Sequence, residues 1–411
     1  MHAPRQLTRS PTLDRVLRGE LCSGCGLCAG VSDGAIRIEA DPPGYNRPTL
    51  VGGLEPAAER KIASACAGAV VESWSGENVD PYWGPWRRVL TGHSLDEVIR
   101  FEGSSGGVIT GLLTHALETG VVDAVIHISP DPAHPARNVT AISHSRQEII
   151  ARAGSRYAPS SPLEVIESCL RDGKRFAFVG KPCDVSALRR LARVDERVDR
   201  QIPLMISFFC GGVPSHAGAD RIVSAMGLEP SDVTEFRYRG RGWPGNCVAA
   251  TPKDRGEMTY AESWGAHLSK EVQFRCKICP DAVGGAADIA CADAWHGDDD
   301  GYPSFAEEPG RSLIMSRTGA GEALLQSAVA AGALAVNPAS INDIERMQPA
   351  QARRKRLVLA RTAALPITLQ PRPRMSGLKV AVAARRARLS EAVQNLVGTV
   401  RRVLQGRRSR L

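Results

Sequence analysis

The chain has 411 residues, of which 43% are hydrophobic and 23% are charged, which is ordinary for a globular protein with a large buried core. The opening segment, MHAPRQLTRSPTLDRVLRGE, has no apolar core of the kind found in secretory signals. No run approaches the ~18 consecutive apolar residues of a membrane-spanning helix. Together with eleven cysteines, these features predict a reducing, cytoplasmic location.

The formal net charge of +8 is unevenly distributed along the chain. Of the 52 Lys and Arg residues, 16 lie in residues 350–411, where Glu391 is the single acid. That leaves 36 basic and 43 acidic residues in 1–349, so the body carries −7 and the tail +15. This asymmetry predicts an acidic catalytic body with a basic appendage.

Four cysteines in residues 1–80 form the most specific motif. They are Cys22, Cys25, Cys28 and Cys66. The first three, in CSGCGLC, have the spacing that holds three corners of a 4Fe–4S cubane, and the fourth, in SACAG, would close the site. Gly24 and Gly26 would let the backbone fold tightly around a cluster. Zinc, which more often takes two CxxC pairs or histidines, and unligated redox thiols are the alternatives. We predict an irregular iron–sulfur module over 1–80.

From about Leu90 the pattern alternates between helices and strands. Helical spacing predicts helices at 106–118, 162–170, 185–191, 216–226 and 321–331. Apolar runs predict strands at 121–128, 175–179 and 203–209, and 235–261 suggests short strands and turns. This alternation predicts a mixed, largely parallel α/β domain over 81–345.

Small residues run into the first of these helices. They are Ser104, Ser105, Gly106 and Gly107, in FEGSSGGV. A helix N-terminus with free N–H groups suits a phosphate or a flavin, although an ordinary serine cap is the alternative. Arg156 and Tyr157, in GSRYAPS, offer a cation and a ring to the same ligand. Further candidates lie in RYRGRGWPG and ADIACADAW, and they are Arg239, Arg241, Trp243, Asp288, Asp293 and Trp295.

A second set of four thiols follows. It comprises Cys183, Cys210, Cys276 and Cys279. The first two each follow a predicted strand, so in a parallel sheet both would lie at the carboxyl edge, where such sheets bind ligands. The CKICPD turn would complete a second 4Fe–4S site, and simple core packing is the alternative. Three other cysteines fit neither pattern and are interpreted as packing residues: Cys169, Cys247 and Cys291.

The basic tail, 346–411, contains an apolar stripe at helical spacing. Its members are Leu389, Val393, Leu396, Val397, Val400 and Leu404. The alternatives are a helix packed on the body with solvated arginines, or a docking element for an acidic electron donor or an anionic membrane surface. The tail lacks interleaved aromatic residues and the body is acidic, so nucleic-acid binding is not predicted.

The ordered set CSGCGLC, SSGGV, GSRYAPS, GKPCDVSALR, FFCGGVPS, YRGRGWPG, CKICPD and ADIACADAW resembles the coenzyme F420 hydrogenase/dehydrogenase beta subunit family. That family includes the 7-hydroxymethyl chlorophyll a reductases, and the resemblance covers about residues 21–331. It implies an iron–sulfur flavoprotein that passes single electrons through clusters to FAD, which exchanges a hydride with an organic partner. On this resemblance, the two cysteine sets would hold two 4Fe–4S clusters and Ser104–Gly107 would be part of the FAD site. Ala67 departs from the proline usual after such a cysteine.

We therefore predict a cytoplasmic oxidoreductase that uses FAD and two 4Fe–4S clusters to act on a small-molecule substrate. The expected donor is a ferredoxin-like protein or reduced coenzyme F420. The alternative is a non-catalytic electron-transfer subunit of a larger redox complex.

Overall fold

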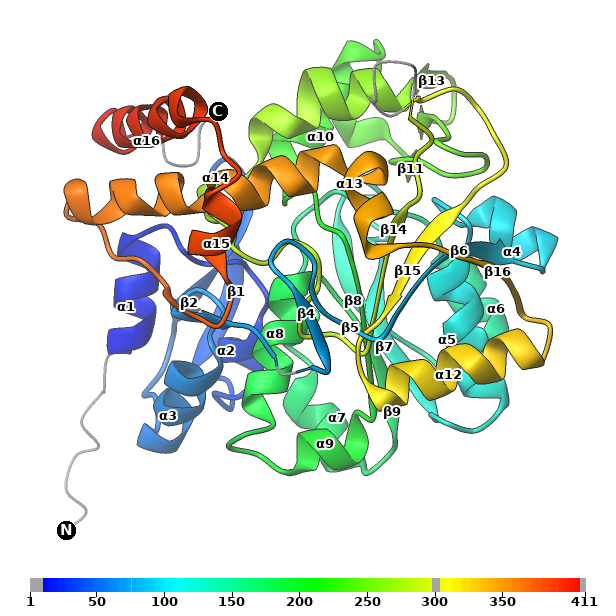
Figure 1. Ribbon diagram of the computed structural model, residues 1–411, viewed down its shortest axis with the longest axis horizontal. Helices are drawn as coiled ribbons and strands as arrows, with labels where there is room; N and C mark the ends of the chain where they lie inside the picture. Colours follow the sequence, from blue (N-terminus) through cyan, green and yellow to red (C-terminus); the bar gives the residue numbers. More distant parts are fainter. Residues whose placement is uncertain (1–9, 75, 298–303, 407–411) are drawn as a thin grey trace.

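The computed structural model describes residues 10–74, 76–297 and 304–406 (Figure 1). Its centre is an eight-stranded sheet with the strand order β16-β6-β15-β14-β10-β9-β7-β8. The strands are β6 (Arg88–Ser94), β7 (Ala124–Pro130), β8 (Asn138–Ser143), β9 (Phe176–Val179), β10 (Leu204–Phe208), β14 (Ile289–Asp293), β15 (Ser312–Ser316) and β16 (Leu334–Pro338).

The sheet is parallel only at its centre. Strands β7, β9, β10 and β14 run parallel, whereas β8, β15, β6 and β16 join by antiparallel pairing. The expectation of a largely parallel sheet is therefore wrong, although the mixed α/β class is confirmed. The three predicted strands are all members of the parallel centre, and the strands that the pattern did not reveal are mostly antiparallel. The short link from β7 to β8 leaves no room for the crossover that a parallel pair needs.

Helices cover both faces of the sheet (Figure 1). One face carries α4 (Glu97–Glu102), α5 (Val108–Glu118), α6 (Arg146–Ala151) and α12 (Gly319–Ala330). The other carries α7 (Ile166–Asp172), α8 (Pro182–Leu191) and α9 (Arg197–Gln201). Alternation along β10 separates two cores, because Leu204 and Ile206 pack toward α5 while Met205 packs toward α8. The predicted helices are confirmed, except that the one expected at 162–170 begins only at Ile166.

A smaller unit lies beyond the carboxyl ends of the parallel strands. It contains α10 (His216–Ala225) and the antiparallel strands β11 (Glu235–Arg237), β12 (Cys247–Ala250) and β13 (Arg255–Met258). Helix α11 (Phe274–Lys277) follows this unit and packs through Phe274 against the core formed by the two chain ends. Two short irregular helices, Ala261–His267 and Leu268–Glu271, lead into α11. The expectation of short strands and turns over 235–261 is confirmed.

The two ends of the chain pack against each other. The N-terminal elements are α1 (Pro11–Arg18), α2 (Leu27–Gly30), β1 (Ile36–Asp41), β2 (Tyr45–Leu50), α3 (Pro56–Ala65), β3 (Val70–Glu72), β4 (Asn78–Asp80) and β5 (Gly84–Trp86). The C-terminal elements are α13 (Ile344–Met347), α14 (Pro349–Ile367), β17 (Arg374–Ser376), α15 (Val380–Ala384) and α16 (Leu389–Leu404). Strand β17 pairs with β3, which joins the basic tail to the N-terminal module.

The predicted tail helix is present as α16, and it packs on α14 (Figure 1). Thr399 and Val403 are buried, whereas Leu389, Val397 and Leu404 are 80%, 57% and 74% exposed. Four members of the apolar stripe, including Val393, are therefore exposed, whereas Leu396 and Val400 are half-buried. Within the described residues, no helix combines the length and apolarity needed to cross a bilayer. The division into 1–80, 81–345 and 346–411 stays a prediction.

Candidate functional site

The four N-terminal cysteines lie around the start of α2. Cys28 is within α2, and Cys66 caps the end of α3. Burial raises the pKa of Cys25 to about 12 and that of Cys66 to about 11, and the thiol of Cys22 raises both further. The pKa of Cys28 is raised by burial and by the other three thiols. Mutual effects of this kind indicate that the four thiols lie near one another, and a bound cluster would displace their protons.

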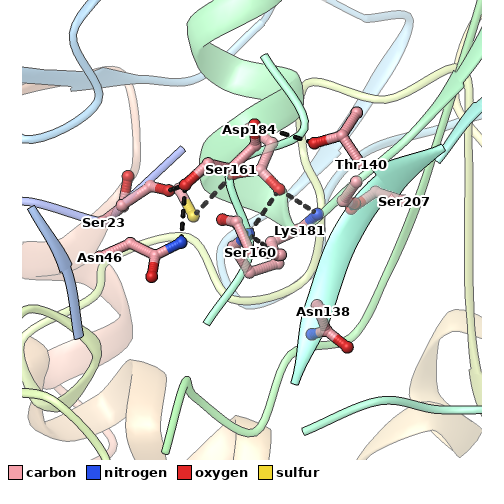
Figure 2. Close-up of polar contacts among 12 residues, drawn as sticks. Ser23, Asn46, Asn138, Thr140, Ser160, Ser161, Lys181, Asp184 and Ser207 are labelled. Atoms are coloured by element: carbon pink, nitrogen blue, oxygen red, sulfur yellow. Dashed lines mark hydrogen bonds and ion pairs between the residues drawn. The ribbon is translucent and has the colours of Figure 1, made fainter. Parts of the chain in front are cut away.

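The loop that carries this first set is held by residues far along the chain. Gly24 and Gly26 have φ of +74° and +83°, so glycine meets a backbone requirement at both positions. A Cβ on Gly26 would lie 2.8 Å from the Ser161 carbonyl oxygen. The Ser161 hydroxyl donates to the Gly24 carbonyl at 2.8 Å and accepts from the Asn46 amide at 2.7 Å (Figure 2). The glycines therefore let the loop pack tightly against the 160–164 segment.

The second set gathers at the carboxyl edge of the sheet. Cys183 and Cys210 follow the parallel neighbours β9 and β10. The backbone N–H of Cys210 donates to the Ala282 carbonyl at 2.8 Å, which brings the CKICPD turn to the same edge. All four thiols, including those of Cys276 and Cys279, line one pocket together with Ser23 of the first loop. Burial and the thiols of Cys276 and Cys279 raise the pKa of Cys210 to about 12.

Helix α14 contacts the loops of this second set. Arg354 donates to the carbonyls of Cys210, at 2.8 Å, and Gly211. Gln351 donates to the same Cys210 carbonyl at 3.0 Å, and Lys355 donates to the Pro280 carbonyl at 2.8 Å. Part of the basic run therefore positions backbone at the site, a role that the sequence did not indicate.

Figure 2 shows a buried ion pair between Lys181 and Asp184. The Lys181 ammonium is 2.8 Å from the Asp184 carboxylate and donates to the Ser160 hydroxyl at 2.7 Å. Burial lowers the pKa of Lys181, but Asp184 and nearby thiols, including Cys183 and Cys25, outweigh it and raise the pKa. The two sites are neighbours, because Ser23 of the first cysteine loop lines the pocket of the second set.

Arg275 is the second buried cation at these sites. It lines the pocket of the second set and is 3% exposed. Its Nη2 donates to the Ala67 carbonyl at 3.0 Å, whereas its Nε and Nη1 have no hydrogen-bond partner. A buried guanidinium with open donors beside four thiols fits an anionic group bound by those thiols. In the described ranges, no three His, Cys, Asp or Glu side chains form a ligand set for a single metal ion.

A cavity of about 540 Å³ lies in the smaller unit, a size typical of ligand sites. Its lining includes three arginines, two aromatic rings and two glutamates: Arg237, Arg241, Arg255, Tyr260, Phe305, Glu257 and Glu307. Three of the predicted ligand loops meet beside it. The Ser155 N–H donates to the Ser104 hydroxyl, Glu102 pairs with Arg237 at 3.2 Å, and the Arg241 N–H donates to the Phe101 carbonyl at 3.0 Å.

The flavin candidates themselves make mostly structural contacts. The Gly106 N–H donates to the Ser312 hydroxyl at 2.9 Å, and Ser105 donates to the Arg311 carbonyl at 2.9 Å. Gly107 has a φ of +72° at the start of α5. Arg156 donates to the Arg137 carbonyl at 2.8 Å, and the Tyr157 ring packs 5.0 Å from that of Trp264.

Aromatic rings connect the cavity with the second cysteine set. Burial and the neighbouring Tyr157 raise the pKa of Tyr260, a cavity residue. Tyr157 contacts Trp264, and a Cβ added to Gly211 would lie 2.5 Å from the Trp264 ring. Gly211 directly follows Cys210. The cavity and the second set are therefore separated by a short run of packed rings.

The remaining candidates have structural partners. Asp293 forms two 2.9 Å bonds with Arg239 and accepts from the Trp243 indole at 2.7 Å. The Trp243 and Trp295 rings stack at 4.8 Å. Asp288 accepts from the Met205 N–H at 2.7 Å. The three other cysteines lie in hydrophobic cores, as expected for packing residues: Cys169, Cys247 and Cys291.

Sequence reasoning missed the residues that act around the thiols. They are Lys181, Gln273, Arg275, Gln351 and Arg354, of which Gln273 donates to the Cys276 sulfur at 3.7 Å. A basic residue directly before the CxxC turn was the signal available for Arg275. Nothing in the sequence places Arg354, which is one of several arginines in a basic run, at the carbonyl of Cys210.

Two family models match the chain. The model described as the N-terminal part of the coenzyme F420 hydrogenase/dehydrogenase beta subunit matches residues 89–167. The model of the C terminus of that subunit matches residues 173–341. Together they span the eight-stranded sheet, the cavity and the second cysteine set.

Individual relatives are redox proteins by name. Coenzyme F420 hydrogenase subunit beta of Methanothermobacter thermautotrophicus is 24% identical over 273 residues, covering 65% of this chain and 88% of that protein. F420-dependent formate dehydrogenase 1 subunit beta of Methanococcus maripaludis is 27% identical over 238 residues, covering 53% and 56%. The chloroplastic 7-hydroxymethyl chlorophyll a reductase of Oryza sativa subsp. japonica is 24% identical over 159 residues, covering 38% and 32%.

The fold is also found in a solved structure. A chain of the F420-reducing NiFe hydrogenase complex from Methanosarcina barkeri superposes with a TM-score of 0.55 and 21% identity, covering 70% of this chain and 96% of that chain. The family matches, together with this shared fold, confirm the resemblance that the motifs indicated. The chain belongs to the coenzyme F420 hydrogenase/dehydrogenase beta subunit family.

Proposed function

We propose that this chain is an iron–sulfur flavoprotein that moves electrons between a ferredoxin-like or F420-type donor and an organic substrate. The observation that carries the proposal is the gathering of eight cysteines into two neighbouring sets of four. Bound 4Fe–4S clusters would supply one-electron transfer, and FAD would couple it to two-electron chemistry.

Each group has residues suited to hold it. One cluster would be held by Cys22, Cys25, Cys28 and Cys66, and the other by Cys183, Cys210, Cys276 and Cys279. The arginine-lined cavity suits the phosphates and ring of a flavin, with Ser104–Gly107, Arg156 and Tyr157 in the loops that border it. Packed aromatic rings bridge the short gap between this cavity and Cys210, which supports electron exchange between a flavin in the cavity and a cluster at the second cysteine set.

A second candidate is a non-catalytic electron-transfer subunit of a larger redox complex. It is favoured by the relatives named as beta subunits of a hydrogenase and a formate dehydrogenase. Turnover of a free small molecule by the isolated chain would favour the enzyme, whereas obligate co-purification with a catalytic subunit would favour the subunit.

Anaerobic purification with iron and sulfide assays tests the cofactor proposal. Two cubanes predict about eight iron atoms per chain, and Cys25→Ala and Cys279→Ala should each remove about half. Cys247→Ala, in the core of the smaller unit, is the matched control and should keep all the iron. Full iron in the Cys279→Ala protein would exclude the second site.

A further inference from the structure

Arg275 carries a charge that the protein itself leaves uncompensated. The described residues contain no carboxylate in ion-pair contact with this side chain, although it is 3% exposed. Of its three nitrogens, one reaches the Ala67 carbonyl and two have no partner. A buried charge without a counter-ion is costly, so a partner from outside the chain is required to balance it.

The surroundings of Arg275 indicate where that partner lies. The guanidinium lies beside the thiols of Cys279, Cys183 and Cys276, and the Cys279 thiol is within hydrogen-bonding range of it. All three thiols belong to the second set and line the same pocket as Arg275. The single bond to Ala67, the residue after Cys66, fixes the guanidinium beside the first set as well.

The other cations of the region have their partners within the chain. Lys181 is satisfied by Asp184 and Ser160, and Arg354 is satisfied by the carbonyls of Cys210 and Gly211. Arg275 differs because its open donors are buried, so water cannot freely replace a missing acceptor.

We propose that Arg275 donates N–H···S hydrogen bonds from Nε and Nη1 to sulfur atoms of the cluster held by the second cysteine set. These bonds would raise the reduction potential of that cluster. This inference depends on the proposed function. Reduction adds one electron, taken from the donor, and neither forms nor breaks a bond. The added negative charge is stabilised by a fixed cation and by hydrogen bonds to sulfur, so both favour the reduced state.

The test compares redox potentials in Arg275→Met, Arg275→Lys and the full-length wild type. Arg317→Lys is the control, because Arg317 is equally buried but donates mainly to the carbonyls of Trp83, Pro85 and Val283. Anaerobic redox titrations followed by electron paramagnetic resonance give the midpoint potential of each cluster. The cluster signal that is missing from the Cys279→Ala protein belongs to the second site.

We expect Arg275→Met to keep its iron and shift that midpoint to a more negative value. Arg275→Lys should shift it less, because the charge remains while donors are lost, and Arg317→Lys should not shift it. Unchanged potentials in both Arg275 variants would overturn the proposal, and so would loss of iron from both, since the residue would then serve assembly. A wild type without iron would instead refute the proposed function.

Discussion

Side chains from distant loops converge on the 540 Å³ cavity, and single residues there can be tested without disturbing the fold. Gly106 is a poor choice, because a Cβ at this position would lie 2.6 Å from the Gly92 carbonyl oxygen and 2.9 Å from the Ser312 nitrogen. A valine there would strain the contact with β6 and β15 whether or not a ligand binds. Arg241 and Arg255 line the cavity and are better probes.

If the cavity holds the flavin phosphates, Arg241→Ala and Arg255→Ala should each lower the flavin retained per chain severalfold. Each change removes a cation that would otherwise pair with phosphate. Flavin released from anaerobically purified protein can be measured by fluorescence. Arg200→Ala, which removes an exposed arginine of α9, should retain the wild-type amount. Normal flavin content in both cavity variants would place the flavin elsewhere.

At the scale of elements, α14 and α16 have separate roles although both belong to the basic tail. Arg354 of α14 holds the backbone at Cys210, whereas α16 contacts α14 through pairs such as Arg353 with Glu391 at 2.5 Å. Truncation after residue 387 removes α16 and should leave the iron of the second set unchanged, whereas Val403 of α16 packs in the core beside Cys22 and Cys66 of the first set.

Arg354→Ala should lower the iron bound by the second set, because the Gly211 carbonyl loses its side-chain donor and the Cys210 carbonyl keeps only Gln351. Iron analysis and visible spectra of the truncated chain and the Arg354→Ala protein provide the comparison. Arg353→Ala, a change at the neighbouring exposed position, is the control. Equal iron in all these proteins would mean that α14 does not support the site.

The sequence allowed the local elements to be predicted better than their assembly. Helical spacing located α5, α8, α10, α12 and α16, and apolar runs located β7, β9 and β10. The antiparallel strands β6, β15 and β16 carried no comparable signal, since their pairing depends on partners hundreds of residues away.

The same contrast applies to the candidate site. Local cysteine spacing indicated the first set, whereas the second set was indicated by two cysteines that each follow a predicted strand together with the CKICPD turn. The open donors of Arg275 and the contact of Arg354 with Cys210 are products of tertiary packing, so spacing could not reveal them.

At the scale of the whole molecule, the charge asymmetry predicts a salt-dependent encounter with an acidic donor. Residues 388–411 contribute six arginines and one glutamate, and α16 also exposes apolar side chains such as Leu389 and Val397. Clustered cations speed association by long-range attraction, which is screened over ~8 Å at physiological salt.

Reduction by an acidic ferredoxin should therefore be slower for the chain ending at residue 387, and the difference should be largest at low salt. Stopped-flow rates at several ionic strengths measure this effect. Binding of the full chain to anionic vesicles, lost on truncation, would identify a membrane surface as the partner instead. Identical salt dependence for both chains, with no vesicle binding, would show that α16 serves the fold.

The bonds that shape the first cysteine loop also set an order of events during synthesis. Ser161 holds the carbonyl of Gly24, and Gln273 donates to that of Ser23 at 3.4 Å. The loop from Cys22 to Cys28 therefore leaves the ribosome long before the residues that complete its shape. A nascent chain cannot finish its first site until residue 273 has emerged, by which point all but two of the eight thiols have emerged as well.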